Sequence, residues 1–188
     1  PMCIRDRSDN ADQWRGHAEA FCGSLGVKLH CETVAVSAGS EAAAREARYS
    51  VFERLLDKGG LVLLGHHADD QVETVLYRLL RGSGVKGLSG IPATRSIAKG
   101  QLIRPLLAWQ KSALRTYADQ HKLSWIEDES NGENTLDRNY LRNQVIPEIA
   151  ARWPDHTQRI GHSARLSQET AELLAALAEE DLQRLDPV

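Results

Sequence analysis

His66, Asp70 and Glu73 lie within eight residues of one another, directly after the apolar run 61–64 and Gly65. Asp70 and Glu73 are three residues apart, so a helix would place them on one face. An imidazole and two carboxylates brought together can hold an ammonium group, accept a proton from it, or bind a metal ion. In open α/β sheets ligands bind beyond the carboxyl ends of the strands, and this order of residues would bring the trio to that edge. Residues 65–73 are therefore a candidate functional site.

Two other interpretations of the same stretch compete with this one. Asp69 and Asp70 are also favourable in the first turn of a helix, because the helix dipole stabilises negative charge there. A divalent-metal phosphoesterase would use His66, His67, Asp69 and Asp70 as ligands, but such sites generally take further His or Asp ligands from other strands. The other five histidines fall within ordinary helical or strand patterns. The gathering of several polar residues behind one apolar strand favours an amine-handling site.

The elements around this stretch alternate between helix and strand. Apolar residues at helical spacing predict helices, and β-branched or continuous apolar runs predict strands. The run 61–64 is typical of a strand buried on both faces of a parallel sheet. The alternation predicts an α/β fold with an open parallel sheet and flanking helices. The predicted order is helix 11–25, strand 27–36, helix 40–58, strand 61–64 and helix 69–81.

Helices dominate the predictions for the second half of the chain. The glycine-rich stretch 82–100 predicts a long loop, and 102–107 predicts a short edge strand limited by Pro105. The last predicted helix carries a stripe of leucines at helical spacing. We therefore expect C-terminal helices after the α/β part. The predicted helices are 111–122, 138–153 with a bend near Pro147, and 156–185.

Composition limits the classes of function. The chain has 188 residues, 41% hydrophobic and 26% charged, enough for one ordinary domain with a core. A formal net charge of −3 argues against a general polyanion-binding surface, although local basic clusters remain compatible with RNA contacts. No stretch approaches the roughly 20 apolar residues of a membrane helix, and no signal peptide is predicted. The three cysteines have no C-x-x-C spacing, which predicts reduced thiols and a cytoplasmic location. Cys22 and Cys31 are predicted to be small core residues.

Residues 65–74, G-H-H-A-D-D-Q-V-E-T, resemble the G-H-H-x-D-D-Q-x-E-T signature of the tRNA(Ile)-lysidine synthetases, members of the PP-loop ATP pyrophosphatase group. Three further blocks resemble the same family in order and spacing. The resemblance covers roughly residues 8 to 153, and its specificity comes from the co-linear order of the blocks. The three further blocks are 80–84 with 87–91, then 104–107, then 128–131 followed by 138–142.

The resemblance implies an ATP-dependent ligase that modifies tRNA. In this family ATP, with Mg²⁺, adenylates the C2 oxygen of the wobble cytidine of tRNA(Ile) with a CAU anticodon and releases pyrophosphate. The ε-amine of free L-lysine then attacks C2 and displaces AMP, which gives lysidine. We also consider a homodimer. Another PP-loop tRNA-modifying enzyme, such as a thiolase, is the alternative, but it would usually bring paired catalytic cysteines, and no cysteine follows Cys31.

The resemblance also carries roles onto residues of this sequence. The candidate trio is predicted to orient the amino groups of lysine, and one of its members to accept the proton that the ε-amine must lose. Substrate oxyanions are assigned to arginines, because a guanidinium group matches a carboxylate or phosphate with two donors. The catalytic residues predicted are His66, Asp70 and Glu73; the substrate-binding residues are Arg138, Arg81 and Arg104; the nucleotide-binding residues are Gly65 and His66.

The arginine assignments have structural alternatives. Arg81 with 82–84 forms either an anion-binding nest or a basic last helical turn closed by a glycine stop. Arg104 serves either substrate binding or a structural ion pair. Arg138 and Arg142 are four residues apart and predict one polar helix stripe, in which Arg142 has the role of a solvated side chain.

The sequence departs from the family near its beginning. The S-G-G-x-D-S ATP loop is absent, and residues 1–7 do not match the apolar strand and histidine pair expected there. Pyrophosphate release depends on backbone donors of such a loop. We therefore expect 1–153 to be a partial catalytic PP-loop domain that is inactive alone. Residues 154–188 are predicted to be a helical linker or the start of a following domain.

Overall fold

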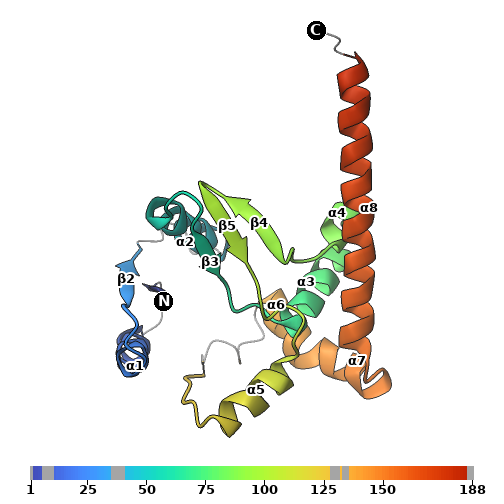
Figure 1. Cartoon of the computed structure of the whole chain (residues 1–188). Coiled ribbons are helices and arrows are strands. Elements are labelled where there is room, and N and C mark those ends of the chain that lie inside the picture. Colours follow the sequence, from blue (N-terminus) through green and yellow to red (C-terminus); the bar gives the residue numbers. More distant parts are fainter. Residues whose placement is uncertain (1, 6–10, 35–40, 128–131, 133–135, 186–188) are drawn as a thin grey trace. The chain divides into compact units, whose positions relative to one another are not determined.

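The computed structural model describes residues 2–5, 11–34, 41–127, 132 and 136–185. The chain divides into two compact units, and Figure 1 labels most of their elements. The motif block 128–131 lies outside the described residues. Unit 1 comprises 1–62, 96–102 and 123–127, and unit 2 comprises 63–95, 103–122 and 128–188.

Unit 1 contains the first two strands and the first two helices. They are β1 (Met2–Arg5), α1 (Ala11–Ser24), β2 (His30–Thr33) and α2 (Glu41–Leu55). β1 and β2 pair in parallel, with Met2 opposite His30. The chain leaves α1 through Gly26, whose φ of 64° belongs to the left-handed region that glycine adopts without strain. The helix predicted for 11–25 is confirmed. Buried apolar side chains of this unit are Cys22, Val51, Phe52, Ile97 and Leu102.

A second, three-stranded sheet has the order β3-β5-β4. Its strands are β3 (Leu61–Leu63), β4 (Thr94–Ile97) and β5 (Gly100–Ile103). The N–H of Gln101 donates to the carbonyl of Gly60, and the N–H of Leu64 donates to that of Ile103, so β3 and β5 run parallel. β4 and β5 are joined by two residues and form an antiparallel hairpin. The sheet is therefore mixed, where the sequence predicted a parallel one.

The prediction that 61–64 is buried on both faces is wrong. Leu61 is 58% exposed and Leu63 is 64% exposed. β3 stands at one edge of its sheet, with a neighbouring strand on one side only. A continuous apolar run identifies a strand, but it does not specify how many neighbours cover that strand.

Unit 2 is mainly helical. Within it, α3 and α4 both pack against α8, and Val72, Val75, Leu141 and Ala164 are buried. The stretch 82–100, predicted as one loop, in fact contains α4 and β4. The helices are α3 (Ala68–Leu80), α4 (Val85–Leu88), α5 (Lys111–Gln120), α6 (Asp137–Tyr140), the π-turn η2 (Leu141–Val145), α7 (Ile146–Arg152) and α8 (His156–Leu185).

The predicted bend near Pro147 takes the form of a π-turn. α6, η2 and α7 follow one another without a break, and η2 ends two residues before Pro147. Proline has no N–H to donate to the preceding turn, and a π-turn is one way in which a helix accommodates such a disruption. The side chains of Asn139 and Leu141 are buried at this point of the run.

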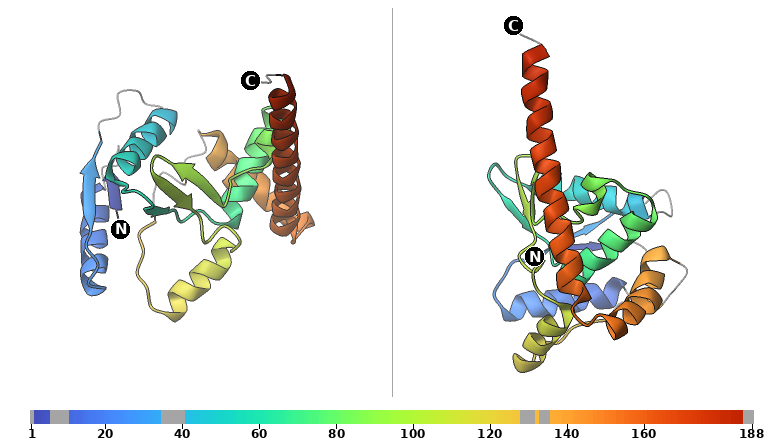
Figure 2. Two further views of the ribbon diagram at one scale, coloured as in Figure 1. Left: turned by 45° about the horizontal axis from the view of Figure 1, so that its top comes forward. Right: turned by 90° about the vertical axis from the view of Figure 1, so that its right-hand side faces the viewer.

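α8 is long, and only its first half is covered. Thr157 and Ala164 are buried, whereas every residue from 172 to 185 is exposed. Figure 1 and the right-hand view of Figure 2 show α8 continuing past α3 and α4. The predicted leucine stripe is therefore in place but uncovered by the described residues. Among the described residues, no helix has the length and apolar character needed to cross a membrane.

Candidate functional site

The predicted site begins where β3 ends. A Cβ placed on Gly65 would meet no other atom within 4 Å, so the space beside this residue is open. Nδ1 of His66 accepts a hydrogen bond of 3.2 Å from Nε of Arg104, which is itself buried and donates from Nη1 to the carbonyl of Pro92 at 2.6 Å. Because Nδ1 is the acceptor, a neutral His66 ring carries its proton on Nε2. Arg104 thus fixes the orientation and the tautomer of His66.

The next residues build the start of α3. The N–H of His67 donates to Oδ2 of Asp70 at 2.8 Å, and the N–H of Asp70 donates to Nδ1 of His67 at 3.4 Å. This reciprocal pair satisfies two backbone donors that a helix start leaves open. Oδ2 of Asp69 accepts from the N–H of Lys111 at 2.7 Å and so joins the starts of α3 and α5. His67, Asp69 and Asp70 all have structural contacts here, and the helix-start interpretation predicted such a role for the two aspartates.

Those contacts bear on the metal-site alternative. In the part of the chain that the structure describes, no group of three or more His, Cys, Asp or Glu side chains is arranged to hold a metal ion. Nδ1 of His67 and Oδ2 of Asp69 instead accept hydrogen bonds from backbone N–H groups.

Glu73 is one helical turn further along α3 and is only 5% exposed. Its two carboxylate oxygens bind the guanidinium group of Arg142 from η2, with Nε to Oε1 at 2.5 Å and Nη2 to Oε2 at 2.8 Å. Two parallel bonds of this kind are short, strong and geometrically specific. The prediction that Arg142 is a solvated side chain is therefore wrong: a carboxylate on the buried side of α3 requires a cation, and Arg142 supplies it.

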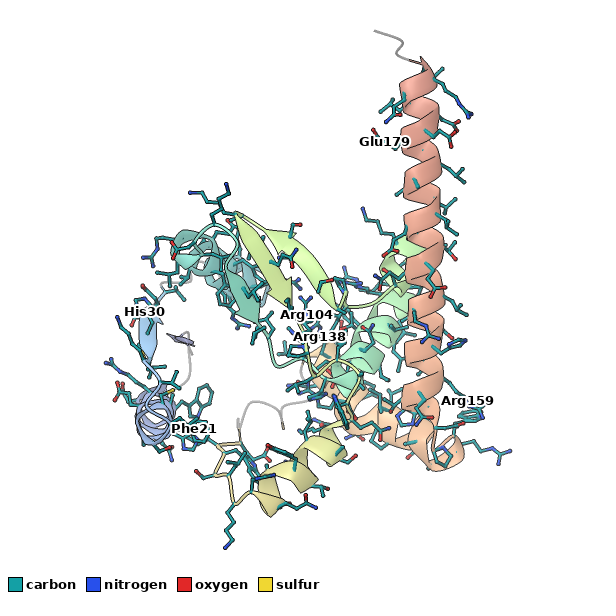
Figure 3. All side chains as sticks on the ribbon, viewed as in Figure 1. Phe21, His30, Arg104, Arg138, Arg159 and Glu179 are labelled. Carbon is teal, nitrogen blue, oxygen red and sulfur yellow. The ribbon has the colours of Figure 1, made fainter. Side chains whose placement is uncertain are left out.

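Tyr77, one turn beyond Glu73, contacts two of the predicted substrate-binding arginines. The guanidinium carbon of Arg81 is 5.2 Å from the centre of its ring, and that of Arg138 is 5.6 Å from it. Nη1 of Arg81 also donates to the hydroxyl oxygen of Tyr77 at 2.5 Å. Figure 3 labels Arg138 on α6 and Arg104 after β5. The sequence predicted both arginines but not the aromatic residue that joins them.

The end of α3 supports the helix-stop interpretation of 82–84. Gly82, with φ of 72°, donates its N–H to the carbonyl of Leu79, and Ser83 donates to that of Arg78. This is the Schellman arrangement, in which the first residues beyond the helix satisfy its last carbonyls. The two N–H groups needed for an anion-binding nest are thus already used.

Two further polar residues of α3 hold the segment that follows. Gln71 exchanges two hydrogen bonds with the backbone of Ile91, and Arg78, two turns later, donates to the carbonyls of Gly87 and Gly90. The sequence analysis did not assign these residues. Their spacing of seven, which places polar side chains on one helical face beside a glycine-rich segment, is the signal that identifies them.

The fold and the polar residues that follow β3 define the class of the protein, and comparison with known protein families agrees. A family model described as the PP-loop domain matches residues 5–149. The chain belongs to the PP-loop domain family. The predicted α/β class, with helices at the C-terminal end, is confirmed.

Within that class the chain is similar to tRNA(Ile)-lysidine synthases, as the four motif blocks predicted. It is 46% identical over 174 residues to the tRNA(Ile)-lysidine synthase of Pseudomonas fluorescens (strain Pf0-1), an alignment that covers 92% of this chain and 39% of that protein. It is 46% identical over 181 residues to that of Alkalilimnicola ehrlichii, covering 94% and 41%. The chain therefore spans about two fifths of the length of these relatives.

A solved structure shows the same fold. The U34-tRNA thiolase NcsA from Methanococcus maripaludis, with its [4Fe-4S] cluster, superimposes with a TM-score of 0.70 at 14% identity. The match covers 89% of this chain and 61% of the thiolase chain. At this identity the likeness concerns the fold alone.

Proposed function

We propose that this chain forms part of the catalytic domain of a tRNA(Ile)-lysidine synthase, which uses ATP to join free L-lysine to C2 of the wobble cytidine of tRNA(Ile) with a CAU anticodon. The observation that carries the proposal is the 46% identity to such a synthase over 92% of the chain. A thiolase is supported by the fold at 14% identity only, and a metal-dependent phosphoesterase has no support from the comparisons. A cytoplasmic location and a homodimer are secondary parts of the proposal.

We assign the binding of the lysine amine to His66, Asp70 and Glu73, whose different contacts favour different roles. Nδ1 of His66 already accepts a hydrogen bond from Nε of Arg104. Glu73 has both oxygens on Arg142. Asp70 uses one oxygen to cap α3 and keeps acceptor capacity on the other. We therefore assign proton acceptance from the lysine ε-amine to Asp70, with His66 and Glu73 orienting the amine.

We assign the binding of substrate oxyanions to arginines. Arg81 is exposed and Arg138 half-buried, so both can reach a ligand, whereas Arg104 is 4% exposed. Arg104 therefore contributes to substrate binding through His66, by holding its ring. A guanidinium group suits either the carboxylate of lysine or a phosphate of tRNA.

ATP and Mg²⁺ enter the proposal through membership of the PP-loop family. The described residues do not fit the phosphates of ATP at the start of α3, because Ala68, His67 and Asp70 already donate their N–H groups to protein acceptors. Acidic side chains in that first turn also repel phosphate. The open space beside Gly65 leaves room for a nucleotide contact by Gly65 and His66. No step through ATP is assigned to these residues.

The test uses the full-length gene product that contains these 188 residues. Purified protein is incubated with ATP, Mg²⁺, radiolabelled lysine and a tRNA(Ile) transcript carrying CAU, and lysine bound to tRNA is counted. The Pseudomonas fluorescens synthase serves as the positive control, and a transcript with GAU as the negative one. ATP-dependent incorporation into the CAU transcript is expected. A protein that leaves this transcript unlabelled while the control enzyme labels it would contradict the proposal.

The assignment of Asp70 predicts the effect of Asp70→Asn. The amide oxygen still caps α3, so the melting temperature should stay close to that of the unchanged protein. Loss of the proton acceptor should lower kcat for lysine transfer by about a hundredfold or more, with tRNA affinity unchanged. The matched control is Asp69→Asn, which changes the neighbouring carboxylate that caps α5. Equal kcat values for the two variants would remove Asp70 from the chemistry.

A further inference from the structure

Tyr77 contacts two arginines of the candidate site, and the proposed reaction assigns it no role. Its half-buried ring lies against Arg81, at the end of α3, and Arg138, on α6. A guanidinium group within about 6 Å of an aromatic ring centre is attracted to the negative face of the ring. One aromatic side chain therefore orients two cations that come from different helices.

The partners of the arginines on and near α3 differ from one arginine to the next. Arg142 is neutralised by Glu73, and Arg78 donates to backbone carbonyls. Arg81, by contrast, has no carboxylate partner within the described part of the chain. The chain as a whole carries a net charge of −3, so this positive cluster is a local feature.

We propose that Tyr77 is a positioning residue that holds Arg81 and Arg138 as one oxyanion clamp for a phosphodiester of the tRNA substrate. The inference rests on the proposed function, because it takes tRNA as the ligand. Two guanidinium groups match the charge and the acceptor geometry of a phosphate. A single carboxylate, the other oxyanion of the reaction, is the competing ligand.

The hydroxyl of Tyr77 adds a donor to the clamp. Its oxygen accepts a hydrogen bond from Nη1 of Arg81, so its own proton remains for a second acceptor. A phosphate oxygen beside Arg81 would be such an acceptor. The ring and the hydroxyl thus make separable contributions: the ring orients both arginines, and the hydroxyl serves Arg81 and the ligand.

The experiment compares Tyr77→Leu and Tyr77→Phe in the full-length protein. We expect Tyr77→Leu to weaken the Kd for a tRNA(Ile) transcript about threefold to tenfold, and to reduce the slope of log K against log[salt] by about 1. Tyr77→Phe keeps the ring and should lie between this variant and the unchanged protein. The KM for lysine should not change. Arg81→Gln and Arg138→Gln should each reduce the salt slope, and should add little in a Tyr77→Leu background.

The matched control is Tyr117→Leu, which removes an exposed tyrosine of α5 whose ring contacts that of His121, just after the helix, in the same unit. It should leave tRNA affinity and salt slope unchanged.

If Tyr77→Leu does not fold, the two arginine variants test the proposal through the same salt slope. An unchanged Kd and slope in a protein that ligates lysine normally would overturn the clamp alone. A raised lysine KM with unchanged tRNA binding would assign the clamp to lysine and overturn the phosphate assignment. Unchanged protein that binds no tRNA would overturn the proposed function itself.

Discussion

Glu73 lies on the buried side of α3, between the buried side chains of Val72 and Thr74, and both its oxygens bind Arg142. Removing one partner of such a pair costs about 3 to 5 kcal/mol when both are fully buried. The Arg142 side chain is 34% exposed, which reduces the cost. We predict that Glu73→Gln lowers the free energy of unfolding by about 2 kcal/mol, measured by urea denaturation. Glu172→Gln, on the exposed part of α8, should leave it unchanged.

A stability cost of this size would itself reduce activity, so the single variant does not separate structure from chemistry. The double variant Glu73→Met with Arg142→Leu removes both charges and keeps the volume. Such replacements of an ion pair are often neutral for stability. A stable double variant that transfers lysine normally would show that Glu73 serves only as the partner of Arg142. A stable but inactive one would support its proposed contact with the amine.

At the scale of elements, α3 organises the chain on both sides of it. Its start is capped by His67 and Asp70, its middle binds η2 through Glu73, and its end is closed by Gly82. Gln71 and Arg78 hold the segment 83–91 against the same helix. One helix of thirteen residues therefore fixes most of the candidate site.

The segment after α3 gives a prediction for Gln71→Ala. This change removes both hydrogen bonds to Ile91 and leaves a part-buried N–H without its partner. We expect a loss of about 1 to 2 kcal/mol in stability and faster hydrogen exchange at the amide of Ile91. Gln183→Ala, on the exposed end of α8, is the control. Unchanged exchange at Ile91 would show that Arg78 alone holds the segment.

Gly90 provides an internal check on the same contact. Its φ is 65°, and a Cβ there would lie 2.5 Å from Oε1 of Gln71. Gly90→Ala should therefore destabilise the protein through both backbone strain and this clash. In a Gln71→Ala background the clash disappears and only the backbone cost remains. The two changes should thus be less than additive.

How far the sequence specifies this structure depends on how local each feature is. The helices with clear periodicity, among them α3, α5 and α8, lie where they were predicted, because the signal is contained in the segment itself. His66 and Glu73 were predicted as site residues from local spacing. Their partners Arg104 and Arg142 lie 38 and 69 residues away, and no local pattern specifies such pairs. The exposure of Leu61 and Leu63 was missed for the same reason, since it depends on which strands become neighbours.

At the scale of the whole chain, charge is distributed unevenly. Residues 172–185 of α8 contain four acidic residues and one arginine, so their formal charge is −3. The formal net charge of the entire chain is also −3. The remaining residues are therefore balanced overall, and basic side chains can gather around α3 and α6 without a basic composition. A phosphate backbone would be repelled by the end of α8 and attracted to the arginines beside Tyr77.

The same end of α8 supports the last prediction, a deletion after residue 171. All of 172–185 is exposed, including five leucines, so these residues bury little apolar surface in this chain. Removing them should change the free energy of unfolding by no more than about 0.5 kcal/mol. It should also reduce self-association at high concentration, measured by sedimentation, because exposed apolar stripes favour it. Ala164→Leu, in the covered half, should instead cost about 1 to 3 kcal/mol by overpacking. A deletion as costly as that substitution would mean that the end of α8 is buried in solution. If a second copy buries it, stability depends on protein concentration; if the same chain buries it, stability is independent of concentration.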